Sequence, residues 1–332
     1  MKVVFVAPYA LPMSVGGFQS QVYRIFDELK DLGIDVSWHN FENSTLDNVD
    51  ILQVMSTDSS MISMMKRAKN KGVKIVLTPM MGSRAASNSY LKVALRLSKL
   101  PQLFSSHKSV LETLHCADHL TPLCSFEANR MIDVYGFQKD QITIIPNGID
   151  DSYFNDDVTN IEPPFKNYLL SIGRIEKEKN QLSLIEVAMT LNMNLIIVGE
   201  PGNSGDSYLR QCKSNANDNI FFWGLEHDTK ALKQLYRQAA LTVIPSLSEM
   251  APLVAFESLS QKTPVVCTNR CGIANDVIPG LFFSDIDKQA LINSIVKALK
   301  YNRSSITNKG IYRWADIATM YKNVYDNILN LS

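Results

Sequence analysis

Short apolar runs rich in β-branched residues alternate with helical patterns along almost the whole chain. In the first half, strand patterns occur at 2–7, 35–39, 51–55, 74–78 and 119–122. Helical patterns lie between them at 19–32, 57–70 and 125–135. This alternation is typical of βαβ units, so it predicts a parallel sheet with helices on both faces.

The alternation stops at 150–167 and then starts again. This stretch is acidic and contains Pro163-Pro164, which is typical of a linker. Later strand patterns lie at 168–172, 194–198, 220–223, 241–244, 264–267 and 281–283. Later helical patterns lie at 180–191, 207–214, 229–238, 251–261, 287–300 and 311–331. We therefore expect an α/β protein with doubly wound domains at 1–157 and 158–310 and a closing helix at 311–332. Ligands of open α/β sheets bind at the carboxyl ends of the strands, so a site is expected where the two sheets meet.

Composition excludes several classes of protein. The net charge is zero and no aromatic-basic interleaving occurs, so we expect no nucleic-acid partner. No apolar run reaches the ~18–20 residues of a spanning helix, and the short apolar start meets Pro8, so a cytoplasmic chain without a signal peptide is expected. The five cysteines have no zinc-site spacing, which favours reduced packing residues and no metal.

The strongest signal is the segment 244–257, where Glu249 and Glu257 lie eight positions apart across a strand–turn–helix junction. The N–H groups of a helix N-terminus favour anions, and a carboxylate on either side can accept hydrogen bonds from sugar hydroxyls. Two solvated carboxylates are the alternative interpretation. The flanking Pro245-Ser246 and Thr263-Pro264 disfavour it.

A second signal is Gly173-Arg174 at the end of a predicted strand, followed by Lys179-Asn180. Glycine permits a tight turn, and the two cations are five residues apart. Both residues suit a diphosphate, because arginine can donate two parallel hydrogen bonds to a phosphate and lysine provides a compact positive charge. An ordinary basic loop beside Glu176 and Glu178 is the alternative.

Two glycine-containing turns are weaker signals. Asn147-Gly148 is typical of a sharp turn at the end of a strand. Gly16 and Gly17 lie in the first strand–helix loop, where glycine lets the backbone approach a phosphate. Neither turn identifies a function by itself.

Taken together and in this order, these motifs resemble the family 4 glycosyltransferases of GT-B fold. The similarity covers nearly the whole chain and extends to Val198-Gly199-Glu200, Trp223-Gly224 and the closing segment from Trp314 to Tyr325. The resemblance implies two Rossmann-like domains facing each other across a cleft. The first would lie on the acceptor side, the second would bind a nucleotide sugar, and the closing helix would cross back to the first.

The resemblance also implies roles for the matching positions. Arg174 and Lys179 would bind the donor diphosphate and Glu249 the donor sugar, so these are the expected catalytic residues. Glu257 would hold the ribose hydroxyls. The other expected donor-binding positions are Gly16, Gly17, Gly224, Met250, Ala251 and Leu253. The enzyme would retain the anomeric configuration, using a UDP- or GDP-linked sugar as substrate with no cofactor or metal. The acceptor would be a glycan or a lipid-linked molecule, in surface polysaccharide or O-antigen (lipopolysaccharide) synthesis.

Two positions depart from the family pattern. Met250 stands where many members have glycine, and the methionine side chain would narrow or reshape the sugar pocket. Pro252, by contrast, fits a subset of members with Glu-Gly-x-Pro. The loop at 79–84 lacks the histidine that members often carry there. Either Ser83 or Arg84 takes that position, or the contact is absent.

Residues 59–111 contain ten Lys or Arg and no Asp or Glu. A helical pattern at 90–100 places Lys92, Arg96 and Lys99 on one face. The stretch 84–108 therefore predicts peripheral contact with an anionic membrane at its inner face. A groove for a lipid diphosphate acceptor and an ordinary solvated surface are the alternatives.

Two other functions remain open for the chain as a whole. A sugar-nucleotide epimerase of GT-B fold would need acid–base carboxylates and a histidine in the cleft, and the missing histidine disfavours it. A non-catalytic subunit that binds a nucleotide or a partner fits Met250 and the missing histidine. The retained Arg174, Lys179, Glu249 and Glu257 disfavour that second alternative.

Overall fold

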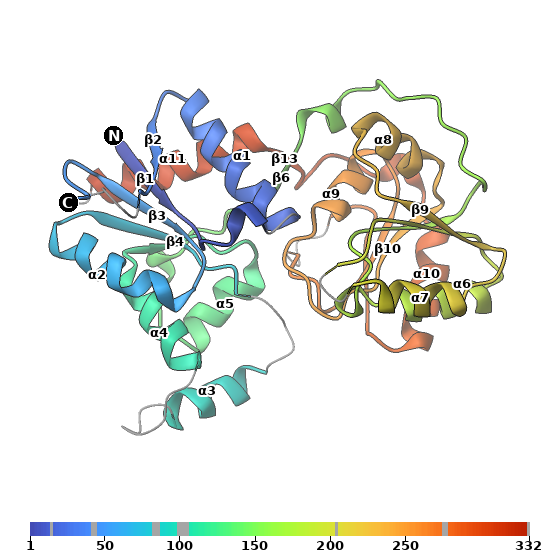
Figure 1. The fold of residues 1–332 in the computed structure, drawn as a ribbon, viewed down its shortest axis with the longest axis horizontal. Coiled ribbons are helices and arrows are strands. Elements are labelled where there is room, and N and C mark those ends of the chain that lie inside the picture. Colours follow the sequence, from blue (N-terminus) through green and yellow to red (C-terminus); the bar gives the residue numbers. More distant parts are fainter. Residues whose placement is uncertain are drawn as a thin grey trace.

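A computed structural model describes residues 1–13, 16–40, 45–81, 87–97, 106–202, 205–273 and 278–330. The chain forms two α/β lobes side by side, with the last helix returning to the first lobe (Figure 1). Each lobe contains one parallel sheet with helices on both faces, so the predicted fold class, two Rossmann-like domains, is confirmed.

The first sheet has the strand order β2-β1-β3-β4-β5, and all four pairings are parallel. Its strands are β1 (Lys2–Val6), β2 (Asp35–Trp38), β3 (Ile51–Met55), β4 (Lys74–Thr78) and β5 (His119–Leu120). Its helices are α1 (Gly17–Asp31), α2 (Ile62–Asn70), α3 (Asn88–Leu97), α4 (Ser106–Cys116) and α5 (Ser125–Asp133). Of these, α4 was not predicted, because its sequence shows no clean apolar period.

Alternate strand residues of the first sheet enter two separate cores, as the period of two dictates. Val3 and Phe5 face a cluster formed with α1 and the last helix, α11 (Trp314–Asn330). Val4 and Val6 face the opposite cluster, formed with α2, α4 and α5. The first domain is therefore completed by the last segment of the chain.

The second sheet has the order β12-β11-β10-β7-β8-β9 and is also parallel. Its strands are β7 (Leu169–Ile172), β8 (Leu195–Val198), β9 (Ile220–Gly224), β10 (Leu241–Ile244), β11 (Val265–Thr268) and β12 (Leu281–Ser284). Helices α8 (Thr229–Gln238) and α9 (Leu253–Ser260) cover one face. Helices α6 (Gln181–Thr190), α7 (Asp206–Ser214) and α10 (Lys288–Leu299) cover the other.

A small two-stranded parallel sheet joins the chain segments between the lobes. It pairs β6 (Gly148–Ile149) with β13 (Tyr312–Arg313). A side chain on Gly148 would approach the backbone of Arg313 and Trp314 to 3.0 Å or less, so glycine is required there. The predicted Asn147-Gly148 turn thus contains a short strand that sequence periodicity did not reveal.

A buried polar network fastens α11 to the first sheet. The Tyr321 hydroxyl lies 2.8 Å from Thr78 Oγ1, and the Tyr325 hydroxyl donates to Gln53 Oε1 at 2.9 Å. Thr78 Oγ1 also accepts from Gln53 Nε2 at 3.1 Å and contacts Thr121 Oγ1 at 2.7 Å. Because buried polar groups need partners, this network fixes how the helix docks.

All five cysteines are buried thiols, consistent with the packing role expected for them. Met61 and Met65 are buried in the core of the first domain. In the described part of the chain, no helix is both long and apolar enough to cross a membrane.

Candidate active site

The loop after β7 brings two predicted catalytic residues into contact. Gly173 has φ of +148°, a value that favours glycine, and the chain then enters a short 3-10 helix at Lys177–Lys179. The Lys179 ammonium pairs with Glu249 Oε2, and Ser246 Oγ donates to the same carboxylate oxygen at 3.1 Å. These side chains are about one-fifth exposed, 22% for Lys179 and 17% for Glu249, so a ligand can reach them.

Arg174 is oriented by a neighbouring carboxylate but remains open to solvent. Its Nη2 atom lies 3.0 Å from Glu176 Oε1, and half of its side chain is exposed while Glu176 is buried. Its carbonyl oxygen accepts from Gln181 Nε2 at 2.9 Å. One carboxylate therefore orients the guanidinium, which has five donors and can still present others to an anion.

Glycines at the carboxyl ends of the neighbouring strands β7, β8 and β9 lie close together in this region. A Cβ atom on Gly199, which follows β8, would overlap the carbonyl oxygen of Gly173. The Gly199 amide donates to the carbonyl of Gly224 at 2.8 Å, and Gly224 has φ of +88°. Gly199 thus lies between Gly173 and Gly224, which is a predicted donor-binding position.

The loop from β10 to α9 is fixed by three other segments. Leu247 N donates to Glu178 O at 2.8 Å, and Gly272 N donates to Glu249 O at 2.8 Å. The Asn147 amide of the first domain donates to the carbonyl of Ala251 at 2.9 Å. Ala251 itself has φ of +43°, an uncommon value for a residue with a side chain. The turn that presents Glu249 is therefore held from both domains.

Met250 lies against Gly272 at this interdomain edge. A Cβ atom on Gly272 would lie 3.0 Å from Met250 Sδ and 3.5 Å from Cys124 Sγ of the first domain. The absence of a side chain at Gly272 therefore accommodates the methionine that replaces the family's glycine. The expected effect of Met250 on a sugar pocket remains a prediction.

Glu257 lies on α9 in an apolar environment that changes its acidity. Burial raises the pKa of Glu257 to about 7, while hydrogen bonds from the Tyr236 and Tyr153 hydroxyls act in the opposite direction. The Tyr236 hydroxyl donates to Glu257 Oε2 at 2.7 Å. Neither tyrosine was predicted, because Tyr236 belongs to the apolar pattern of α8 and Tyr153 lies in the acidic stretch interpreted as a linker.

The first domain reaches the same edge through its glycine loop. Gly16, with φ of +146°, precedes the first residue of α1. A Cβ atom on Gly17 would lie 3.9 Å from Leu253 Cδ1, and Leu253 packs against the core of the first domain. The predicted donor-binding positions Gly17 and Leu253 thus face each other across the two domains.

A buried carboxylate in the first domain was missed by the sequence analysis. Glu127 on α5 accepts from Met81 N at 2.7 Å and from Leu123 N at 2.9 Å. Burial raises the pKa of Glu127 to about 7. It fastens the start of the loop in which the family often has histidine, at a point where Met80 has φ of +47°. Within that loop, Ser83 and Arg84 lie outside the described residues, as does Lys99 further on.

Comparisons with known proteins agree with this geometry. The sequence model of the family described as "Glycosyl transferases group 1" matches residues 155–310, which contain the Arg174, Lys179, Glu249 and Glu257 positions. A D-inositol 3-phosphate glycosyltransferase from Acidothermus cellulolyticus is 26% identical over an alignment 188 residues long, which covers 51% of this chain and 42% of that protein. The chain therefore aligns with less than half the length of this relative.

Solved structures resemble the chain over its full length. A glycosyltransferase from Rickettsia africae superimposes with a TM-score of 0.71 at 16% identity, covering 99% of this chain and 98% of that one. Anabaena Alr3699/HepE, in complex with UDP, gives 0.69 at 14% identity, covering 98% and 100%. The second domain therefore matches the group 1 glycosyltransferase model, and the whole chain shares the two-domain fold of these solved structures.

Proposed function

We propose that the chain transfers a sugar from a nucleotide-diphosphate sugar to an acceptor with retention of the anomeric configuration. The observation that carries this proposal is the contact between Lys179 and Glu249 in front of α9, opposite Gly17 of the first domain. A cation, a carboxylate and a helix N-terminus that meet at an interdomain edge suit a donor with a diphosphate and a sugar.

In the proposed reaction, the bond between the anomeric carbon and the diphosphate oxygen breaks, and the acceptor oxygen forms the new bond while its proton passes to the leaving diphosphate. Negative charge builds on the leaving diphosphate. Lys179, Arg174 and the N–H groups at the start of α9 stabilise that charge, because fixed dipoles and cations need no reorganisation. Glu249 accepts hydrogen bonds from the hydroxyls of the donor sugar, and Glu257 accepts hydrogen bonds from the ribose hydroxyls.

The proposed donor is UDP- or GDP-linked, and UDP is the first candidate because a structural neighbour is described in complex with it. The proposed acceptor is a glycan or a lipid-linked molecule of surface polysaccharide or O-antigen synthesis. The relatives carry the name D-inositol 3-phosphate glycosyltransferase, which makes an inositol phosphate the competing acceptor to test.

The first experiment measures the thermal midpoint against UDP, GDP, ADP, CMP and their sugars. A ligand that binds only the folded protein raises the midpoint by mass action, so the true donor should stand out. We expect Lys179→Ala to abolish the shift and Lys177→Ala, an exposed neighbour on the same turn, to preserve it. A folded protein with no shift for any nucleotide would contradict the proposal.

Product analysis separates the two alternative functions. An epimerase would convert the nucleotide sugar without an acceptor, whereas the proposed transferase needs one. A non-catalytic subunit would bind nucleotide without turnover, and Glu249→Ala would leave its partner function unchanged. We expect turnover that depends on the acceptor and that Glu249→Ala removes.

Peripheral membrane contact through α3 at the inner face of the membrane is part of the proposal. Tyr90, Val93 and Leu97 share one face of this helix and are 58%, 53% and 54% exposed, while Leu91 and Leu95 are buried against the domain. Figure 1 shows α3 at the lower edge of the first lobe, below α4. An exposed apolar stripe beside Lys92 and Arg96 suits an anionic lipid surface.

Vesicle sedimentation tests this contact. We expect the chain to sediment with phosphatidylglycerol vesicles, to be released from them by salt, and not to sediment with phosphatidylcholine vesicles. The double variant Lys92→Glu/Arg96→Glu should lose binding, while Lys300→Glu/Lys309→Glu on the second domain should keep it. Equal binding by both double variants would place the contact elsewhere.

A further inference from the structure

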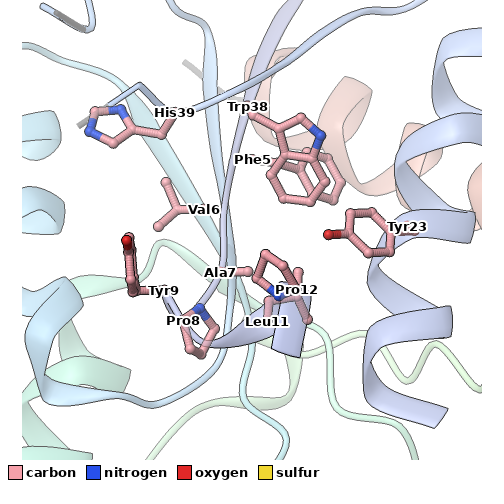
Figure 2. Close-up of a pocket in the computed structure, with 10 residues that line it drawn as sticks. All are labelled: Phe5, Val6, Ala7, Pro8, Tyr9, Leu11, Pro12, Tyr23, Trp38 and His39. Carbon is pink, nitrogen blue, oxygen red and sulfur yellow. The ribbon is translucent and has the colours of Figure 1, made fainter. Parts of the chain in front are cut away.

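The first domain contains a pocket at the carboxyl ends of β1 and β2. Its volume is about 300 Å³, which is at the lower end of the range for small-molecule sites. Figure 2 shows Tyr23, Trp38 and Phe5 on one side, Tyr9 and His39 on the other, with the turn around Leu11 and Pro12 beside them. None of the donor-binding residues predicted from the sequence lines it.

The walls of the pocket are fixed by packing and hydrogen bonds. Trp38 stacks on Phe26 with ring centres 4.7 Å apart, and its edges contact Phe5 and Tyr23 at 5.9 and 5.7 Å. Gln19 Nε2 of α1 donates to Leu11 O at 3.1 Å and to Pro12 O at 3.0 Å, which fastens the opposite turn. The pocket is therefore preformed, so filling it costs little ordering of the protein.

The lining carries no formal charge. None of its ten residues is Asp, Glu, Lys or Arg. Burial lowers the pKa of His39, so its imidazole is neutral near pH 7. A phosphate placed there would lose its hydration without a cation in compensation. A sugar ring needs hydrogen-bond partners around its rim, and the side chains offer only two tyrosine hydroxyls, one indole N–H and one imidazole.

The same loop connects this pocket to the donor side. The chain leaves β1 at Val6, forms the pocket wall with Tyr9 and Leu11, and then reaches Gly16-Gly17, which faces Leu253. A molecule seated in the pocket therefore lies at the same carboxyl edge as the glycines that face the second domain.

We infer that this pocket holds an apolar or aromatic part of the acceptor. This inference rests on the proposed transferase function and specifies its acceptor class: the molecule carries an uncharged hydrophobic group close to the oxygen that receives the sugar. A phosphate-bearing acceptor would have to place its anion outside these ten residues.

Calorimetric titration of the full chain with four probes tests the inference. The probes are hexyl, phenyl and methyl β-D-glucopyranoside and glucose 6-phosphate. We expect the hexyl and phenyl glucosides to bind at least tenfold more tightly than the methyl glucoside, and glucose 6-phosphate not to bind. Trp38→Ala should weaken phenyl glucoside binding at least tenfold, and Trp38→Phe should restore most of it.

Tyr9→Ala provides a second variant that cannot unfold the protein, because Tyr9 is 86% exposed. It should weaken hexyl and phenyl glucoside binding about threefold, an effect of the size expected when part of an apolar wall is removed. Phe221→Ala, an exposed aromatic on β9 of the second sheet, is the matched control and should change nothing.

Two results would overturn the inference: glucose 6-phosphate or methyl glucoside binding as tightly as phenyl glucoside, or unchanged phenyl glucoside binding in folded Trp38→Ala and Tyr9→Ala. The nucleotide shift is measured separately in every variant. If it is present while the glucoside results fail, only the pocket inference falls. If it is absent in the unaltered chain, the transferase proposal falls first.

Discussion

The carboxyl edges of the two sheets differ in chemistry although the sheets share one architecture. The edge of the second sheet presents Arg174, Lys179 and Glu249, all linked to neighbours by ion pairs. The pocket at the edge of the first sheet is lined by aromatic and apolar residues without a formal charge. One βαβ framework therefore supports a polar site and an apolar site, because the residues that line each one lie at the carboxyl ends of the strands and in the loops that follow them.

Each domain also contains a glutamate whose pKa is raised by burial, fully buried at Glu127 and half-buried at Glu257, and the two differ in their partners. Glu127 accepts two backbone N–H groups and fastens a loop. Glu257 accepts a tyrosine hydroxyl and lies on the helix that begins at the proposed diphosphate site. We interpret Glu127 as a structural carboxylate and Glu257 as one that also faces a ligand.

The largest expected effect is at Lys179. Replacing Lys179 by Ala should lower kcat about 10²–10³-fold, the loss typical for one group that stabilises developing negative charge. Lys177→Ala should stay within about twofold of the unaltered rate. Initial rates at saturating donor measure both. A loss smaller than tenfold for Lys179→Ala would mean that the second-domain edge is not the site of charge development.

A smaller effect is expected at Glu257. Glu257→Gln removes an anionic hydrogen-bond acceptor, so the KM for the donor should rise about tenfold, equivalent to about 1.4 kcal/mol. Glu127→Gln, the matched change in the first domain, should leave that KM unchanged. Donor titrations of the two variants decide whether Glu127 and Glu257 differ in role as their partners indicate.

The pH dependence of stability should report both glutamates. Burial raises each pKa from 4.5 to about 7 in the folded protein. Below pH 4.5 both states hold the proton. Between pH 4.5 and 7 the unfolded chain ionises first, so the free energy of unfolding falls, by at most about 1.4 kcal/mol per pH unit for each group. Urea unfolding at pH 5, 6 and 7 should show a slope that each Glu→Gln variant reduces. An unchanged slope in Glu127→Gln would show that this carboxyl is ionised when folded.

The smallest expected effect concerns the helix that completes the first domain. Tyr321→Phe removes the hydroxyl 2.8 Å from Thr78 Oγ1, although Thr78 keeps its contacts with Gln53 and Thr121. The free energy of unfolding should fall by about 1 kcal/mol. Tyr301→Phe in the second domain, whose ring packs on Phe282, is the control and should leave it unchanged. A loss above about 3 kcal/mol would show that the network acts as one cooperative unit.

Local pattern predicted the regular elements closely. The strands β3, β4 and β10 and the helix α8 have the predicted bounds. Their hydrophobic pattern, which repeats every two or 3.6 residues, can be recognised from consecutive residues alone. The prediction failed for α4, and for β6 and β13, two-residue strands that exist only because segments far apart in sequence meet.

The sequence by itself determined the alternating α/β fold with two parallel sheets and the candidates Arg174, Lys179, Glu249 and Glu257, because these follow from local period and ordered motifs. Only the tertiary structure decided that Lys179 touches Glu249, that Asn147 holds the carbonyl of Ala251, and that Trp38 and Tyr9 line one pocket. Such contacts join residues tens of positions apart. Their distances depend on how the sheets twist and how the helices pack, and no single stretch of sequence encodes that.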